Sequence, residues 1–149
     1  MILNKYEAWD RLLKYEEEYL RKKLRDKADS IFNSWIRDRD KWLWCVSYGA
    51  GNCKNCVEHA CHRIEAARYS HRRDENNVHW GCSTCNWYNK REHIMYYDQR
   101  MISKYWKKWT EKQLFIKHKI KPSIEELLAI INKYTKRQKK PLKNQRKSV

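Results

Sequence analysis

Two pairs of cysteines are the residues of this chain whose spacing most directly indicates chemistry. Cys53 and Cys56 form one Cys-x-x-Cys pair, and Cys82 and Cys85 form a second, with 25 residues between the pairs. Two such pairs supply four thiolates to a tetrahedral zinc ion at about 2.3 Å each, whereas cysteines that only fill a core have no reason to recur in this way. The spacing therefore predicts a structural Zn²⁺ site, with Cys45 as an alternative that could replace Cys53 or Cys56.

Three polar residues around these pairs indicate phosphodiester hydrolysis. His62 and Asn77 lie between the pairs, and Asn86 directly follows Cys85. In metal-dependent nucleases of the ββα-metal type, a histidine on a strand is the general base toward water, and a divalent ion stabilises the charge on the phosphate. Because the order here resembles an HNH arrangement, we expect His62 to be the base, Asn77 to orient it and Asn86 to bind Mg²⁺ or Mn²⁺. Asn77 could instead cap the turn that follows it.

Other residues offer alternatives for these roles. His59 is a second candidate for the base, and Glu92 or His93 could enter the catalytic metal site; we include His93 as a further ligand of the catalytic ion. If His62 and Asn86 served only structure, the chain would be a non-catalytic zinc module that binds nucleic acid.

The charge of the chain indicates a polyanionic partner. Its 149 residues include 34 Lys and Arg against 18 Asp and Glu, which gives a net charge of +16. We expect basic side chains near the candidate active site to contact the DNA backbone, namely Arg68, Arg72, Arg73, Lys90 and Arg91. Three other residues are candidates for stacking on unpaired bases or for core packing, namely Trp80, Trp87 and Tyr88. Three histidines are expected at the surface or against DNA rather than in catalysis, namely His71, His79 and His118.

Hydropathy indicates an intracellular protein without a membrane partner. No apolar run approaches the ~20 residues of a membrane span, and the N-terminus turns polar too early for a signal peptide. If the chain comes from a phage, we expect it in the cytoplasm of the bacterial host.

The elements that position these residues are expected to be mainly α-helical, with a small β hairpin. We predict an N-terminal helical segment over 1–40, a zinc-bound HNH-like catalytic module over 41–93, C-terminal helices over 94–135 and a disordered basic tail over 136–149. The periodicity of apolar residues predicts a helix over 4–31 and a shorter segment over 31–36. We interpret the apolar stripe of the first helix as a packing surface, with dimerisation as the alternative.

The C-terminal part is predicted to contain two helices. One extends from Ile94 to Trp109, and the other from Ile124 to Tyr134, where Ser123 and Glu126 form a capping box.

Several stretches of the chain resemble the phage NinG (Rap) recombination endonuclease family. Ala60-Cys61-His62 is similar to the Ala-Gly-His of that family, and the stretch 72–86 is similar to its arginine-rich segment that ends in Asn-Val-His-x-Gln-Cys-x-x-Cys-Asn. The stretches 32–40, 45–47 and 97–105 also resemble the family, so that the resemblance covers roughly residues 30–106. Three places depart from the pattern, namely Tyr48 in place of the second cysteine of the first pair, Cys61 in place of glycine, and 90–93 in place of Ser-Gly-Asn.

The resemblance implies a DNA endonuclease that hydrolyses branched recombination intermediates such as Holliday junctions. Cutting two strands of a symmetric junction calls for two active sites related by a two-fold axis, which makes a homodimer a reasonable expectation. An HNH nuclease that acts on linear duplex is the alternative enzyme.

Overall fold

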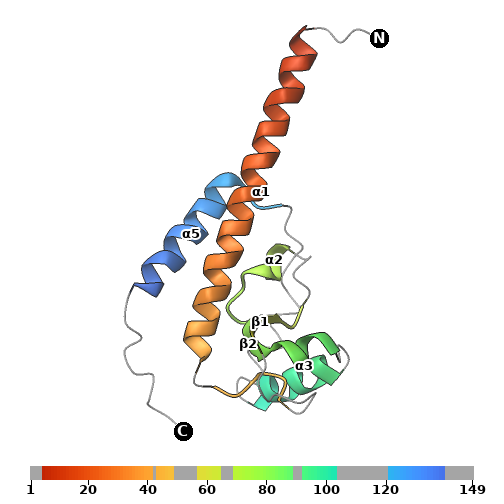
Figure 1. Cartoon of the computed structure of the whole chain (residues 1–149), viewed down its shortest axis with the longest axis vertical. Coiled ribbons are helices and arrows are strands. Elements are labelled where there is room, and N and C mark those ends of the chain that lie inside the picture. The colour runs from red at the N-terminus through yellow and green to blue at the C-terminus, as the bar shows by residue number, and fades with distance from the viewer. Residues whose placement is uncertain are drawn as a thin grey trace.

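The computed structural model describes residues 5–41, 43–48, 57–64, 69–88, 92–103 and 121–139. Its described part is mainly helical with one small antiparallel sheet, as expected (Figure 1). The elements are α1 (Lys5–Asp40), β1 (Glu58–His62), α2 (Tyr69–Arg72), β2 (Val78–Cys82), α3 (Ser83–Tyr88) and α5 (Ile124–Gln138), and residues 92–103 are also helical. Among the described helices, none combines the length and apolar character needed to cross a membrane.

The first helix is longer than the sequence predicts. α1 continues without a break for 36 residues to Asp40, so the expected boundary near residue 31 is wrong. Phe32, Trp35 and Ile36 are all buried, because the apolar stripe of the helix continues past residue 31 and packs against the rest of the protein. The N-terminal half of α1 extends away from the other elements (Figure 1).

The two strands form an antiparallel hairpin in which His62 pairs with Val78 and Cys61 pairs with His79. Because successive side chains of a strand point to opposite faces, the hairpin buries two different surfaces. Val78 packs into a cluster with Phe32 of α1, whereas Cys61 packs against Tyr97 of the helix at 92–103. The hairpin therefore lies between α1 and that helix, which covers the first ten residues of the one predicted over 94–109; residues 104–109 lie outside the described part.

α5 packs beside α1 and begins where the sequence predicts. The Ser123 side chain accepts a hydrogen bond from the Glu126 N–H and the Glu126 carboxylate accepts one from the Ser123 N–H, which confirms the capping box. Tyr134 packs on Phe32, with ring centroids 4.9 Å apart. α5 continues to Gln138, so the prediction that the disordered tail starts at residue 136 is wrong for its first three residues, and 140–149 lie outside the described residues.

Glu75, in the loop before β2, attaches α5 to the hairpin. Its carboxylate accepts hydrogen bonds from Tyr134 Oη (2.8 Å), Lys133 Nζ (3.0 Å) and Arg137 Nη1 (2.6 Å). Burial alone would raise the pKa of Glu75, but the hydrogen bonds from Tyr134 and Lys133 outweigh it and lower that pKa. Arg137 thus extends the helix because its charge has a partner, although the sequence there resembles a solvated basic run.

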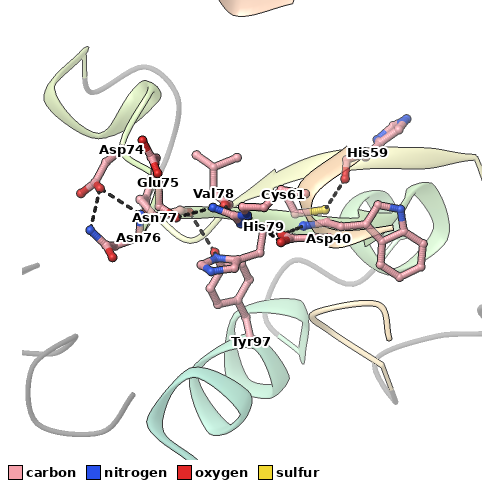
Figure 2. A network of polar contacts seen from close by, with 12 residues as sticks. Asp40, His59, Cys61, Asp74, Glu75, Asn76, Asn77, Val78, His79 and Tyr97 are labelled. Carbon is pink, nitrogen blue, oxygen red and sulfur yellow. Dashed lines mark hydrogen bonds and ion pairs between the residues drawn. The ribbon is translucent and has the colours of Figure 1, made fainter. Parts of the chain in front are cut away.

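The last two residues of α1 hold β2 in place, and Figure 2 shows the second of them, Asp40, beside the hairpin. Arg39 donates to the carbonyl oxygens of Glu75 (3.1 Å) and Val78 (3.0 Å), and its guanidinium also pairs with Asp40 at 2.6 Å. The Asp40 carboxylate in turn accepts the Trp80 N–H at 3.0 Å. These contacts fix the end of the long helix against the hairpin that carries the candidate site.

Candidate metal centre and active site

Three buried cysteines lie together at the junction of β2 and α3. The sulfur atoms of Cys45, Cys82 and Cys85 all lie within 4.8 Å of one another. Zinc–sulfur bonds of about 2.3 Å in a tetrahedron require sulfur atoms roughly 3.8 Å apart, so these three thiols are close to the spacing of a metal site. The three cysteines could therefore bind a metal ion such as zinc.

Backbone amides support this arrangement of sulfur atoms. The Cys82 N–H donates to Cys45 Sγ (3.3 Å), and the Cys85 N–H donates to Cys82 Sγ (3.4 Å). Cys45 is held in turn by Arg100, whose Nη1 donates to the Cys45 carbonyl at 3.0 Å, and by the neighbouring Val46 N–H, which donates to the Trp80 carbonyl at 3.0 Å. The donor set and its surroundings thus fit a soft metal ion.

The cysteine positions differ in part from the predicted set. Cys82 and Cys85 lie together as expected, but the third sulfur comes from Cys45, which the sequence offered only as an alternative. Cys53 and Cys56 lie outside the described residues. Cys61 is buried on the other side of the hairpin, and burial raises the pKa of its thiol, so it stays uncharged.

His62 ends β1, and one of its ring nitrogens has a fixed partner. Its Nε2 lies 3.0 Å from the carbonyl oxygen of Arg72. Because a carbonyl oxygen can only accept, Nε2 carries the proton, and the lone pair of the neutral ring is on Nδ1. Burial lowers the pKa of His62, opposed only in part by the Arg72 and Ala60 carbonyls and by Asp29. His62 is therefore a neutral base at neutral pH.

Asn77 fixes the loop that contains this carbonyl rather than touching the His62 ring. Its Oδ1 accepts the Ile64 N–H (2.8 Å), and its Nδ2 donates to the carbonyls of Ile64 (3.0 Å) and His71 (2.9 Å). These bonds join the chain just after β1 to the residue before Arg72. Asn77 can thus position His62 through the backbone, whereas the sequence predicts that Asn77 orients the His62 ring directly.

A second buried network, which the sequence did not reveal, holds Asn77 from below (Figure 2). Tyr97 Oη donates to the Asn77 carbonyl at 2.9 Å, so His79 Nδ1, at 2.6 Å from the same hydroxyl, must be the donor of that second bond. His79 and His71 are buried, so the expectation that they lie at the surface or against DNA is wrong; His118 lies outside the described residues.

The remaining predicted site residues are distributed around the hairpin. Asn86 lies half-buried in α3, directly after Cys85. His59 precedes His62 by three positions on β1, so its side chain belongs to the opposite face of the strand. His93 is buried beside Tyr97, with Nδ1 2.5 Å from Ser47 Oγ, and burial lowers its pKa. The contacts of His93 are thus with Ser47 and with Tyr97 of its own helix, which packs on Cys61 of the hairpin.

Two of the predicted DNA-binding arginines are engaged by an acid of α1. Asp29 pairs with Arg72 Nε and with Arg73 Nη2, both at 2.7 Å. The Arg73 side chain is only 6% exposed, whereas that of Arg72 is 29% exposed. Both therefore anchor the loop to α1, and Arg72 keeps part of its surface accessible. Arg68, Lys90 and Arg91 lie outside the described residues, and so do the side chains of Trp87 and Tyr88; Trp80 packs against the three cysteines.

Comparison with known proteins returns one family. No curated protein matches the chain, and no solved structure does. The family described as Bacteriophage Lambda NinG protein matches residues 6–145. This match is wider than the resemblance over roughly 30–106 and includes both α1 and α5. The chain therefore belongs to the NinG family, a family of phage proteins.

Proposed function

We propose that this protein is a metal-dependent DNA endonuclease of the HNH type that acts on branched recombination intermediates. One observation carries the proposal, namely that His62 Nε2 donates to the Arg72 carbonyl and so leaves the basic nitrogen at Nδ1. A general base must present its lone pair to water, and in the neutral His62 ring that lone pair is on Nδ1. The order of β1, β2 and α3, with a cysteine pair at the start of α3, is also that of a ββα-metal nuclease.

In this mechanism, His62 Nδ1 takes a proton from a water molecule as the water oxygen attacks phosphorus. The bond from phosphorus to the leaving oxygen breaks, and that oxygen is protonated by solvent. Asn77 maintains the loop that holds His62, and its buried amide keeps the base in position through the reaction.

A Mg²⁺ or Mn²⁺ ion would supply stabilisation of the negative charge on the phosphate and the leaving oxygen. Asn86 offers one oxygen ligand for it. Among the residues that the structure describes, the cysteine cluster is the one group of three or more His, Cys, Asp or Glu side chains suited to a metal. Such an ion would thus take most of its ligands from DNA phosphates and water, as Mg²⁺ commonly does.

We propose zinc for the cysteine cluster. Cys45, Cys82 and Cys85 would supply three thiolates, and Cys53 or Cys56 would supply the fourth. Elemental analysis should find about one zinc per chain, as one four-ligand site implies. Cys82→Ser should lower both the zinc content and the melting temperature, because binding energy at a structural zinc is folding energy. A zinc-free protein of unchanged stability would contradict this assignment.

The net charge of +16 supports a DNA partner, and the family favours a role in phage recombination. Branched DNA is proposed rather than linear duplex because phosphate contacts from residues such as Arg72 read no sequence. Discrimination would then rest on the shape of the DNA.

The test is a side-by-side cleavage assay on a labelled four-way junction, a flap and a linear duplex of the same sequence, with Mg²⁺ or Mn²⁺. We expect preferential cutting of the junction, and a loss of about a hundredfold or more for His62→Ala, the usual scale for a general base, with DNA affinity unchanged. His59→Ala is the matched control on the other face of β1 and should cut normally.

Each rival function predicts a different result. Equal cutting of junction and linear duplex would indicate a general HNH nuclease. DNA binding without cleavage under any divalent ion would indicate a non-catalytic zinc module. Normal cutting by His62→Ala with loss in His59→Ala would transfer the role of base to His59.

A further inference from the structure

The N-terminal half of α1 carries an apolar stripe whose side chains are largely exposed in the described part of the protein. Further along the helix, Ala28 packs against Leu127 and Ile131 of α5, flanked by Leu24 and Ile31. The same stripe continues toward the N-terminus with four exposed residues, namely Tyr6 (77% exposed), Trp9 (56%), Leu13 (58%) and Leu20 (47%). Figure 1 shows this half of α1 standing clear of the other labelled elements. The apolar stripe of α1 thus continues toward the N-terminus well beyond the part that α5 covers.

The spacing of the stripe is that of a coiled-coil seam. Tyr6, Leu13 and Leu20 occupy the first position of successive heptads and Trp9 occupies the fourth, whereas the next two fourth positions hold Glu16 and Lys23. A solvated helix has no need for a heptad of large apolar residues over four turns. The seam therefore indicates a helical partner.

We propose that this partner is α1 of a second copy of the chain, packed antiparallel. In a parallel pair, Glu16 would face Glu16 and Lys23 would face Lys23, so like charges would meet at two layers of the seam. In an antiparallel pair, two seam residues face each other when their numbers add to 29. Glu16 then no longer faces Glu16 and Lys23 no longer faces Lys23, so both like-charge contacts are removed.

The antiparallel register gives Trp9 and Tyr6 suitable neighbours, and it places Glu16 opposite Leu13. Trp9 of one copy packs on Leu20 of the other, and this layer occurs twice because of the two-fold axis. Lys23 faces the Tyr6 ring, a contact of the kind it already makes within its own helix, where Nζ lies 4.6 Å from the Tyr19 centroid. α1 of the second copy would cover the part of the stripe that lies between its contact with α5 and the N-terminus. This pairing does not depend on the proposed nuclease activity.

Two charge substitutions at one seam layer test the proposal. Trp9→Lys and Leu20→Glu should each convert the full-length protein from a dimer, with twice the 18.5 kDa mass of the chain, to a monomer. Tyr15→Lys is the matched control, because Tyr15 is 69% exposed but lies on the opposite side of the helix; it should remain dimeric. The measurement is sedimentation equilibrium over a concentration series, with circular dichroism to verify that each variant is folded.

Mixing the two monomeric variants tests the direction of the helices. Only in the antiparallel pair does Lys at position 9 of one variant face Glu at position 20 of the other, so the equimolar mixture should regain dimers. A wild-type protein that is monomeric throughout the series would overturn the proposal, and so would a dimer that persists in Trp9→Lys. Failure of the mixture to associate would overturn the antiparallel arrangement.

Discussion

Gly81→Ala should destabilise the protein through a contact with one neighbouring side chain. A Cβ atom on Gly81 would lie 2.5 Å from Cys61 Sγ and 3.5 Å from Val46 Cγ1. The Cys61 sulfur cannot swing aside easily, because Cys61 is 1% exposed and packs against Val46, Tyr97 and Met101. Overpacking of this kind costs about 1–3 kcal/mol. The reduced entropy of the unfolded chain returns up to about 1 kcal/mol, so we expect a net loss of about 1–2 kcal/mol.

The two positions are linked because the Cys61 sulfur is the atom nearest to the place that a Cβ on Gly81 would take. Cys61→Ala should therefore relieve the clash, since the nearest remaining atom of residue 61 is Cβ, at 3.4 Å.

A double-mutant cycle measures this coupling. Urea unfolding with zinc present gives the free energy for the wild type, both single variants and the double variant; melting temperatures should follow at roughly 2–4 °C per kcal/mol. We expect Gly81→Ala to be nearly neutral in the Cys61→Ala background, which gives a coupling of about 1–2 kcal/mol. An equal cost of Gly81→Ala in both backgrounds would refute the reasoning.

Three other perturbations have defined outcomes. Asp29→Asn should cost about 3 kcal/mol in urea unfolding, because it leaves a buried guanidinium without its carboxylate; a cost no larger than that of Asp26→Asn, an exposed acid of the same helix, would contradict it. Deletion of 140–149 removes four basic residues, so it should weaken binding to all DNA shapes alike and reduce the salt dependence of that binding. An unchanged salt slope in a fluorescence binding titration would show that these residues do not contact DNA. Burial lowers the pKa of His62 and His93, so the unfolded chain binds more protons than the folded one. The free energy of unfolding should therefore fall as the pH drops below about 6.5, the ordinary pKa of histidine. His93→Asn should make that fall shallower, and a pH profile identical to that of the wild type would exclude His93 as a source.

Features that depend on neighbours in the sequence could be predicted, and those that depend on distant partners could not. The capping box of Ser123 and Glu126 and the pair Cys82 and Cys85 each involve residues three positions apart, so their spacing alone specifies the local structure. Cys45 reaches Cys82 across 37 positions, and only the folded hairpin brings them together.

The charged run at the end of α1 shows the same limit. Arg39 and Asp40 are charged residues that follow the apolar segment predicted over 31–36, and nothing in their local sequence indicates a partner. Their side chains instead bind backbone groups of β2, nearly 40 positions away. Arg73 resembles a DNA contact for the same reason, since its partner Asp29 lies 44 positions earlier in the chain. Charge in a sequence does not distinguish a solvated side chain from one with a distant partner.

The contacts along β2 have a consequence for the solubility of the metal-free protein. A two-stranded sheet has an outer edge on each strand, and an open edge can pair with strands of other molecules. On β2 this edge is closed by three residues, because Arg39 binds the Val78 carbonyl, Asp40 binds the Trp80 N–H, and the Val46 N–H binds the Trp80 carbonyl. The last edge amide, that of Cys82, donates to the sulfur of Cys45. A metal ion bound by Cys45 and Cys82 would fix Cys45 and Val46 against this edge. Removal of the metal would therefore expose a strand edge as well as destabilise the fold, and the metal-free protein should aggregate before it unfolds.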